Sequence, residues 1–336
     1  RKESSAASDV YKRQVERIVS LPNINNRLIF AGYSFKDDST LERLKARGYK
    51  NQWRIDPQKD LNIVDRSASI ETFQSVFNLD KAKKIRQEKG YVDVMIVRHV
   101  VEHAYDLPQF VAAISEMIHE DGYIIWELPD CENALEKGDC TTIWEEHLHY
   151  FTSFTFKNML TSSGFTIIHN ESVSYPLENS LIVITKKNTE NKIRVIPNQD
   201  ILNTECKRAY QFANKVTEHK KKIQLKLRKF KQSNKSIALF GAGHLSVAFI
   251  SIMDISDEID FVIDDNPNKH NMLMPVGDIK ILGSDSLYSK NINLCLLGLN
   301  PQNQPKLIAR HAEFIEIGGR FASIFPETIL DLEKMI

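Results

Sequence analysis

Short apolar runs alternate with segments of helical period along the first part of the chain. Four runs are predicted to be strands, over residues 27–32, 52–56, 92–100 and 123–128. Between them, Ser39 and Glu42 stand at the spacing of a capping box and predict a helix over 39–47, while a helical period predicts another over 107–119. Strands that alternate with helices indicate an α/β fold with a parallel, doubly wound sheet.

The alternation continues in the second half of the chain. Runs at 165–170 and 180–186 are rich in β-forming residues and predict an antiparallel hairpin at the edge of the first sheet. A long helix is predicted from about residue 202 to 231, and its many lysines are interpreted as a solvated face because an apolar stripe of helical period accompanies them. A second, smaller α/β unit is then predicted from strands over 236–240, 261–264, 294–297 and 321–325, with a helix over 244–253 after the first.

These patterns divide the chain into four predicted parts. Residues 1–14 have no apolar period and resemble an adapter-derived scar or a disordered tail, so they are left out of the predicted fold. Residues 15–187 are predicted to form the first Rossmann-like domain, and 188–235 a linker with a connecting helix. Residues 236–336 are predicted to form the C-terminal Rossmann-like α/β domain.

Composition narrows the classes of function. The chain has 336 residues, and its 44 Lys+Arg balance 44 Asp+Glu, which gives no electrostatic reason to expect a nucleic acid partner. No apolar run reaches the roughly 18 residues that a membrane span needs, so no membrane partner is expected. The four cysteines lack the spacing of metal ligands and are interpreted as reduced thiols of a cytoplasmic protein.

A glycine and an acid follow the first two predicted strands. Gly32 ends the first strand, where the absence of a side chain would let a ligand approach the backbone. Asp56 ends the second strand and could accept hydrogen bonds from both hydroxyls of a ribose. This pair suits a cofactor that contains adenosine, although an ordinary structural turn explains a single glycine equally well.

Two further stretches concentrate titratable groups. Residues 98–103 read RHVVEH and lie at the end of the central predicted strand, where open α/β sheets bind their ligands. Residues 141–151 read TTIWEEHLHYF, and a histidine beside a carboxylate among aromatic residues is suited to act as a general base. Surface histidines in the first stretch, and a core-facing amphipathic helix in the second, are the alternatives.

Taken together, these features resemble a known family, the S-adenosylmethionine-dependent sugar C-methyltransferases. The resemblance rests on colinear motifs: Gly32, Asp56-Pro57, RHVVEH, the Trp126–Pro129 segment WELP, and WEEHLHYF. FGAG at 240–243, DDNP at 264–267 and GGRF at 318–321 resemble the family's second α/β domain. The chain differs from the family at residues 33–38, which are less rich in glycine, and at Trp144-Glu145, where the family has Tyr-His. The family usually carries an N-terminal, cysteine-based zinc module; it is not in this sequence, either because the subgroup lacks it or because it was lost upstream of the scar.

The resemblance implies a function and a set of roles. Residues 15–187 would be the methyltransferase domain, which would methylate a carbon of a nucleotide-linked ketodeoxysugar, with S-adenosylmethionine as the cofactor and no catalytic metal. His147 would be the base that removes the proton beside the ketone, and Glu146 would orient it or hold a sugar hydroxyl. His99 and His103 would stabilise the enolate oxygen. Gly32 and Asp56 would bind the cofactor.

Two other functions fit parts of the sequence. Gly241 and Gly243 follow a predicted strand, and Asp264 lies farther along, which approximates a dinucleotide fingerprint and allows an NAD-dependent oxidoreductase; Ser246 stands where the third glycine would be. A non-catalytic protein that binds nucleotide sugars is the third hypothesis, motivated by the changes at 33–38 and at Trp144. Binding of S-adenosylmethionine, of NAD, or of the sugar nucleotide alone would separate the three.

Overall fold

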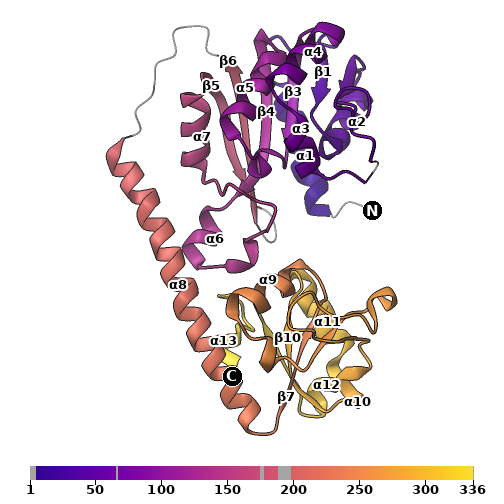
Figure 1. The fold of residues 1–336 in the computed structure, drawn as a ribbon, viewed down its shortest axis with the longest axis vertical. Coiled ribbons are helices and arrows are strands. Elements are labelled where there is room, and N and C mark those ends of the chain that lie inside the picture. The colour runs from indigo at the N-terminus through magenta and orange to yellow at the C-terminus, as the bar shows by residue number, and fades with distance from the viewer. Residues whose placement is uncertain (1–4, 66, 175–177, 188–197, 336) are drawn as a thin grey trace. The chain divides into compact units, whose positions relative to one another are not determined.

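The chain forms two compact units (Figure 1). The computed structural model describes residues 5–65, 67–174, 178–187 and 198–335. The first unit consists of Arg1–Glu132 with Glu145–Leu202, and the second of Asn133–Trp144 with Asn203–Ile336. The segment Asn133–Trp144, which the sequence pattern had assigned to the first domain, therefore belongs to the second unit.

The first unit is built on a six-stranded sheet in the order β2-β1-β3-β4-β6-β5. Its strands are β1 (Phe30–Gly32), β2 (Gln52–Arg54), β3 (Val92–Arg98), β4 (Ile118–Asp130), β5 (Phe165–Val173) and β6 (Asn179–Lys187). The first four run parallel, and β6 lies antiparallel between β4 and β5. The predicted α/β class, parallel core and closing hairpin are thus confirmed.

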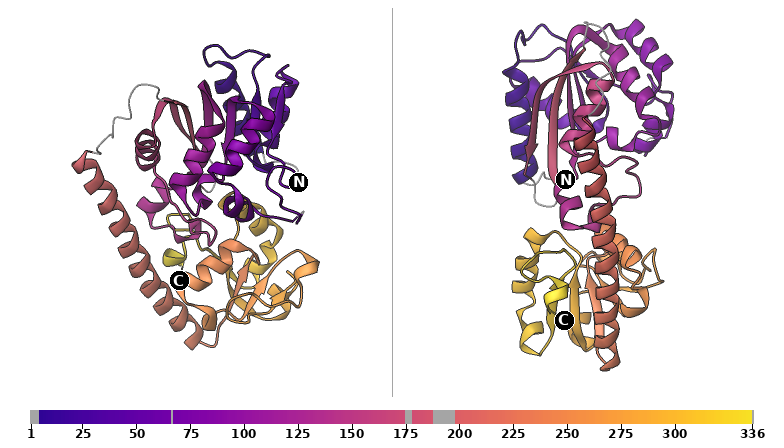
Figure 2. Two further views of the ribbon diagram at one scale, coloured as in Figure 1. Left: turned by 45° about the horizontal axis from the view of Figure 1, so that its top comes forward. Right: turned by 90° about the vertical axis from the view of Figure 1, so that its left-hand side faces the viewer.

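Helices cover both faces of this sheet, as the edge-on view in Figure 2 shows. The helices are α1 (Ser5–Val19), α2 (Asp38–Ala46), α3 (Ile70–Val76), α4 (Leu79–Lys89), α5 (Leu107–Met117) and α7 (Ser153–Ser162). Buried side chains of α1 and α2 pack on one face of the sheet. Those of α3, α4, α5 and α7 pack on the other, around Met95 and Trp126. Both faces can be apolar because successive side chains of a strand point to opposite faces of the sheet.

The start of the chain differs from the prediction. Residues expected to be a scar or disordered tail enter helix α1, which begins at Ser5, and the Gln14 side chain is fully buried. Gln14 donates to Glu127 at 2.7 Å and accepts from Thr40 at 2.6 Å. A polar group that is buried and hydrogen-bonded in this way is part of the folded unit. The origin of residues 1–14 stays a prediction.

The second unit contains a five-stranded parallel sheet in the order β11-β10-β7-β8-β9. Its strands are β7 (Ser236–Phe240), β8 (Phe261–Ile263), β9 (Ile281–Leu282), β10 (Ile292–Leu297) and β11 (Arg320–Ser323). The chain order reverses between β7 and β10, so the sheet has the Rossmann strand order 3-2-1-4-5, without a sixth strand among the described residues. This confirms the predicted C-terminal α/β domain.

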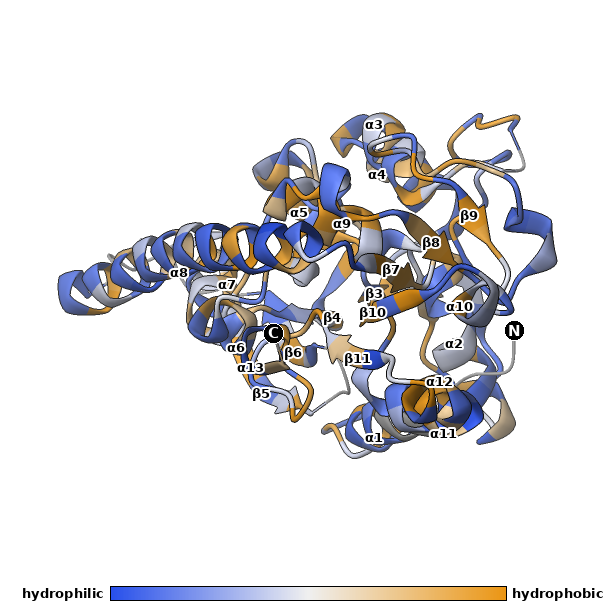
Figure 3. Cartoon of the chain, turned by 90° about the horizontal axis from the view of Figure 1, so that it is seen from below, coloured by the Kyte–Doolittle hydropathy of each residue, from blue (hydrophilic) through white to orange (hydrophobic). Residues whose placement is uncertain are grey.

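The helices of the second unit are α6 (Glu132–Lys137), α8 (Gln199–Gln232), α9 (His244–Met253), α10 (Ser286–Ser289), α11 (Gln304–Arg310), α12 (Ala312–Glu316) and α13 (Leu332–Met335). Helix α8 is largely hydrophilic in Figure 3, and of its side chains Ile223 and Leu227 are buried against the sheet. Arg228 and Lys231 pair with Glu258 and Asp260. These contacts agree with the predicted solvated face. The predicted linker residues 188–197 lie outside the described residues.

Local differences from the predicted elements have simple causes. The capping box forms at Ser34 and Asp37, ahead of a short 3₁₀ turn (Phe35–Asp37), and not at Ser39 and Glu42. Residues 118–122, which lie between or at the ends of the predicted helix 107–119 and strand 123–128, are part of the long strand β4. Among the described residues, no helix is both long enough and apolar enough to cross a membrane.

Candidate active site

The polar side chains of the first unit gather where strands β3 and β4 end. Arg98 is the last residue of β3, and its side chain is only 1% exposed. His99 follows with a positive φ of 49°, which bends the chain into the 3₁₀ turn Val101–His103. This bend is possible because polar residues such as histidine tolerate the left-handed region better than most. The RHVVEH stretch is therefore at the carboxyl end of β3, the edge at which open α/β sheets generally bind ligands.

Glu127 on β4 is the buried centre of this edge. Its carboxylate accepts from Arg98 Nε and from Gln14 Nε2, each at 2.7 Å, and from the Ser180 hydroxyl at 3.3 Å. Burial alone would raise the pKa of Glu127, but the charges of Arg98 and His99 outweigh burial and lower its pKa to about 2. Glu127 is thus a fixed anion, and the sequence analysis had assigned it no role.

His99 is held between two carboxylates. Its Nε2 lies 3.3 Å from Glu127 Oε1 and its Nδ1 lies 3.7 Å from Glu102 Oε1, although 35% of the side chain remains exposed. Burial opposes the charged form, but the two acids outweigh it and raise the pKa of His99 to about 9. His99 is therefore a cation near neutral pH and is unsuited to be the base.

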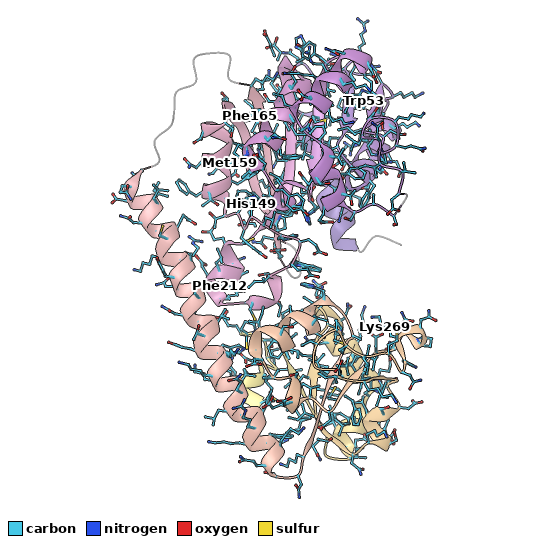
Figure 4. The ribbon with its side chains drawn as sticks, in the orientation of Figure 1. Trp53, His149, Met159, Phe165, Phe212 and Lys269 are labelled. Atoms are coloured by element: carbon cyan, nitrogen blue, oxygen red, sulfur yellow. The ribbon has the colours of Figure 1, made fainter. Side chains whose placement is uncertain are left out.

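The predicted catalytic stretch 141–151 is attached to the end of β3 by backbone contacts. The amides of Leu148 and His149 donate to the carbonyl of Glu102 at 2.9 and 3.1 Å. The His149 ring lies 2.9 Å from the carbonyl of Ala104, and Figure 4 labels this side chain in the first unit. The stretch is an irregular loop and not the amphipathic helix considered as its alternative, and this loop carries His147 toward His103.

His103 and His147 meet at this attachment. Their rings make an edge-to-face contact with centroids 4.7 Å apart. The ligand atoms of Glu102, His103 and His147 all lie within 4.8 Å of one another. Glu146, in contrast, is exposed on the loop. The structure thus brings together two of the predicted residues, His103 and His147, with His99 joined to them through Glu102.

Glu71 completes the cluster and was missed by the sequence analysis. It lies in α3, and its Oε1 is 2.9 Å from His103 Nδ1. Burial raises its pKa, but the hydrogen bond from Ser69 and the His103 ring outweigh this effect, so the pKa is lowered. Nothing in the local pattern around residue 71 marks it, because only the packing of α3 against the end of β3 places it there.

Gly32 ends β1, as predicted, and its missing side chain makes room for the following loop. A Cβ on Gly32 would lie 2.9 Å from Asp37 Cβ and 3.0 Å from Leu41 Cδ1. Asp37 accepts from the amides of Ser34 and Arg98 at 2.8 and 3.0 Å. Burial raises its pKa to about 7, against the opposing effects of the Ser34 amide and the Arg98 charge.

The larger side chains of residues 33–38 do not all face the strand ends. Tyr33 is fully buried, and its ring makes edge-to-face contacts with Phe73, Phe77 and Phe110. Phe35 is exposed. The departure from a glycine-rich loop therefore adds an aromatic side chain to the core beneath α3 and α5.

Asp56 lies just after β2 and is half-buried. Its Oδ1 accepts from the amides of Gln58 and Lys59, both at 2.9 Å. These bonds, with that of Lys59 the strongest effect, lower the pKa of Asp56. Because the described hydrogen bonds go to Oδ1, Oδ2 retains the capacity to accept from a ligand hydroxyl.

The acid of the dinucleotide-like motif in the second unit is engaged internally. Asp264 Oδ2 accepts from the Ala242 amide at 2.8 Å and from Lys269 Nζ at 3.0 Å, and its Oδ1 accepts from the Asn266 amide at 2.9 Å. Figure 4 labels Lys269. An acid with both oxygens in use is a poor acceptor for the hydroxyls of a ribose. This geometry disfavours the oxidoreductase hypothesis.

Trp144, which stands where the resembling family has a tyrosine, belongs to the second unit. Its ring stacks on His244, the first residue of α9, with centroids 3.5 Å apart and planes 4° from parallel. His244 Nε2 also lies 3.2 Å from the carbonyl of Ile143. Trp144 therefore anchors the segment Asn133–Trp144 within the second unit.

Comparison with known proteins agrees with this architecture. A methyltransferase-domain family matches residues 33–170, and the C-methyltransferase C-terminal domain family matches residues 183–326. The first match covers the sheet that bears the candidate site, and the second covers the C-terminal α/β unit. The two matches together identify a methyltransferase domain followed by a C-methyltransferase C-terminal domain, so the chain is a methyltransferase of this domain composition.

Individual relatives are distant. C-methyltransferase NovU of Streptomyces niveus is 21% identical over 280 residues, which are 81% of this chain and 66% of that protein. The chain thus spans slightly less than two thirds of the length of this relative.

Solved structures resemble about half of the chain, with low TM-scores. An S-adenosylmethionine-dependent methyltransferase of Archaeoglobus fulgidus is 15% identical with a TM-score of 0.35, over 54% of this chain and 94% of that one. The 1,6-didemethyltoxoflavin-N1-methyltransferase of Burkholderia thailandensis is 10% identical with a TM-score of 0.37, over 55% and 80%.

Proposed function

We propose that the chain methylates a carbon atom beside a ketone of a nucleotide-linked deoxysugar, through an enolate formed by a base. The observation that carries this proposal is the meeting of His147 and His103 at the carboxyl end of β3, in a chain with both domains of the C-methyltransferases. The sugar and its nucleotide are the classes implied by the resemblance described above.

His147 is the proposed base. Removal of a proton beside a ketone needs a group whose pKa lies near neutrality, and neutral histidine meets this requirement. His147 is half-buried on a loop that is fixed to Glu102 by two backbone hydrogen bonds. Its ring nitrogen would accept the proton, the substrate carbon would then bond to the transferred methyl group, and the ketone would re-form while His147 returns its proton to solvent.

The neighbouring histidines have separate proposed roles. His103, oriented through Nδ1 by Glu71, would in its doubly protonated form donate from its other nitrogen to the enolate oxygen. His99 has both nitrogens directed at carboxylates, so its proposed contribution is the positive charge. Glu146 would hold a sugar hydroxyl from the exposed side of the loop. Oriented charge of this kind stabilises a developing oxyanion where water is excluded.

The carboxyl ends of β1 and β2 fit the cofactor. Gly32 and Arg54 pair in parallel register, which brings Asp56 to the edge that Gly32 ends. Asp56 Oδ2 would accept from the ribose, and Gly32 would lie beneath the amino-acid end. S-adenosylmethionine supplies an electrophilic methyl group when bound, so these residues need only hold and orient it.

We further propose a reducing compartment, the cytoplasm, for this reaction. The four cysteines are free thiols, and Cys131, Cys140 and Cys295 are buried. Burial raises the pKa of the Cys140 thiol to about 12, so it stays protonated and unreactive.

Calorimetric titration of the full chain with S-adenosylmethionine, and separately with NAD, tests the class. The full chain is needed because Gln14 belongs to the folded unit. We expect binding of S-adenosylmethionine and none of NAD. Binding of NAD alone would move the site to the second unit and refute the proposal, while binding of a sugar nucleotide alone would support a non-catalytic protein.

Replacement of His147 by Ala tests the mechanism. We expect methyl transfer to a ketosugar nucleotide to fall by at least about 100-fold, the usual contribution of a general base, while S-adenosylmethionine binds unchanged. His119→Ala, at an exposed position on β4, is the matched control. Unchanged turnover in His147→Ala would exclude this residue as the base.

A further inference from the structure

A cluster of nitrogen and oxygen ligands lies within the candidate active site. Glu102, His103 and His147 each offer one ligand atom, and these atoms lie within 4.8 Å of one another. Two imidazoles and one carboxylate are a donor set that zinc and similar divalent transition ions prefer. We propose that these three residues bind a divalent transition ion of the zinc type, and that its occupancy prevents His147 from accepting a proton.

The carboxylate of the cluster has an unused oxygen. Glu102 is 2% exposed, and its Oε1 lies 3.7 Å from His99 Nδ1. Among the described residues, Oε2 is buried and has no hydrogen-bond partner. A buried charged oxygen without a partner is costly, and a bound cation would remove that cost.

Glu71 has the position of an outer-shell partner. Its carboxylate lies 2.9 Å from His103 Nδ1, which leaves Nε2 as the nitrogen for a metal. A carboxylate on the second nitrogen of a metal-binding histidine fixes the tautomer and the ring orientation, and it strengthens the ligand. Glu71 is partly exposed, so its substitution should change the stability of the fold only slightly.

Backbone hydrogen bonds connect the two segments that bear the ligands. Glu102 and His103 are adjacent in the turn Val101–His103, and the loop bearing His147 is attached to this turn by the amides of Leu148 and His149. No other group of three such side chains gathers in this way in the described parts of the chain. Three protein ligands leave a coordination position open for water or a substrate oxygen.

The consequence for the reaction rests on the proposed function. A histidine whose ring nitrogen is bound to a metal has no lone pair with which to accept a proton. Zinc should therefore inhibit methyl transfer by occupying the ring nitrogen of His147, without displacing S-adenosylmethionine.

Zinc binding to the untagged full chain is the first test. Competition with a chromogenic chelator gives the affinity, in a Cys206→Ser background because this exposed thiol can itself bind zinc. We expect one zinc ion, an affinity lowered at least tenfold by His147→Ala, and an affinity lowered about 10- to 100-fold by Glu71→Gln. His169→Ala is the control, since this histidine lies on β5 beside Glu171.

Two results overturn the site: no stoichiometric zinc, or an affinity unchanged in both His147→Ala and Glu71→Gln. Circular dichroism melting of each variant ensures that a lost site is not a lost fold. If zinc inhibits methyl transfer and a chelator relieves the inhibition, the proposed effect of zinc on the reaction is supported. If zinc binds without inhibiting, that effect is refuted. Absence of any methyl transfer would refute the proposed function and leave the binding result intact.

Discussion

A few individual residues stabilise the buried carboxylate of Glu127 near the end of β4. Glu127 is 1% exposed and receives hydrogen bonds from Arg98 and Gln14. Neither partner could be predicted from local sequence, since they come from β3 and α1. Removing either Glu127 or Arg98 leaves the other charge buried without its partner, which strongly lowers the free energy of unfolding.

Glu127→Gln should lower the free energy of unfolding by about 3 kcal/mol at pH 7. Because the folded state lowers the pKa of Glu127 to about 2, its contribution is fully present above the unfolded value of 4.5 and is lost as the pH falls through 2. The difference in the free energy of unfolding between the wild-type protein and Glu127→Gln should therefore become smaller as the pH falls below about 4.5.

Urea denaturation of both proteins between pH 2.5 and pH 7 measures this difference. Glu88→Gln, at an exposed position on α4, is the control and should change stability by less than about 0.5 kcal/mol. A difference that does not depend on pH would contradict the lowered pKa.

Tyr33 shows where reasoning from single residues fails. The sequence analysis noted residues 33–38 only as less rich in glycine than the family, but the Tyr33 ring is buried among Phe73, Phe77 and Phe110. A side chain's direction depends on the strand that precedes it and on helices distant in sequence. Neither is visible in the motif itself.

At the scale of elements, strands were predicted better than caps and short helices. Strong apolar runs identified β3, β7 and β10, because buried parallel strands are continuously apolar. Helix α3 was missed, and with it Glu71, since its seven residues are too few for a clear period. The capping box was placed at Ser39 because spacing alone does not distinguish two serines near one helix start.

Asn78 provides a test of capping. It is the N-cap of α4, and its side chain accepts from the Lys81 amide at 3.0 Å. Asn78→Ala should lower the free energy of unfolding by about 1 kcal/mol, because an amide of the first turn loses its partner. Urea denaturation measures the loss. Gln87→Ala, exposed in the same helix, should be neutral, and an equal loss there would contradict the capping role.

At the scale of the whole molecule, both α/β units were predicted, but the path of the chain between them was not. Composition gave no sign that Asn133–Trp144 leaves the first unit for the second. The reason lies in tertiary packing: Cys140 is buried in the core of the second unit, and Trp144 stacks on His244. Neither contact has a local signature.

His244→Ala should therefore affect the reaction although His244 lies in the second unit. Loss of the stacked ring frees Trp144, and His147 follows it by three residues. We expect turnover to fall severalfold while the affinity for S-adenosylmethionine is unchanged, since positioning of the base is altered and cofactor contacts are not. His244→Phe should restore turnover. Equal turnover in all three proteins would show that the stack has no such role.

Because Asn133–Trp144 belongs to the second unit, its position also determines how the chain can be cut into separately produced fragments. The backbone passes from one unit to the other after Glu132, after Trp144 and after Leu202, so no single cut separates them. A fragment that ends at Leu202 would keep Cys140 and Ile143 but lose the apolar partners that cover them. Such a fragment would expose apolar surface and tend to aggregate. If residues 133–144 were replaced by a short polar link, a fragment ending at Leu202 would contain only the first unit and could be produced alone.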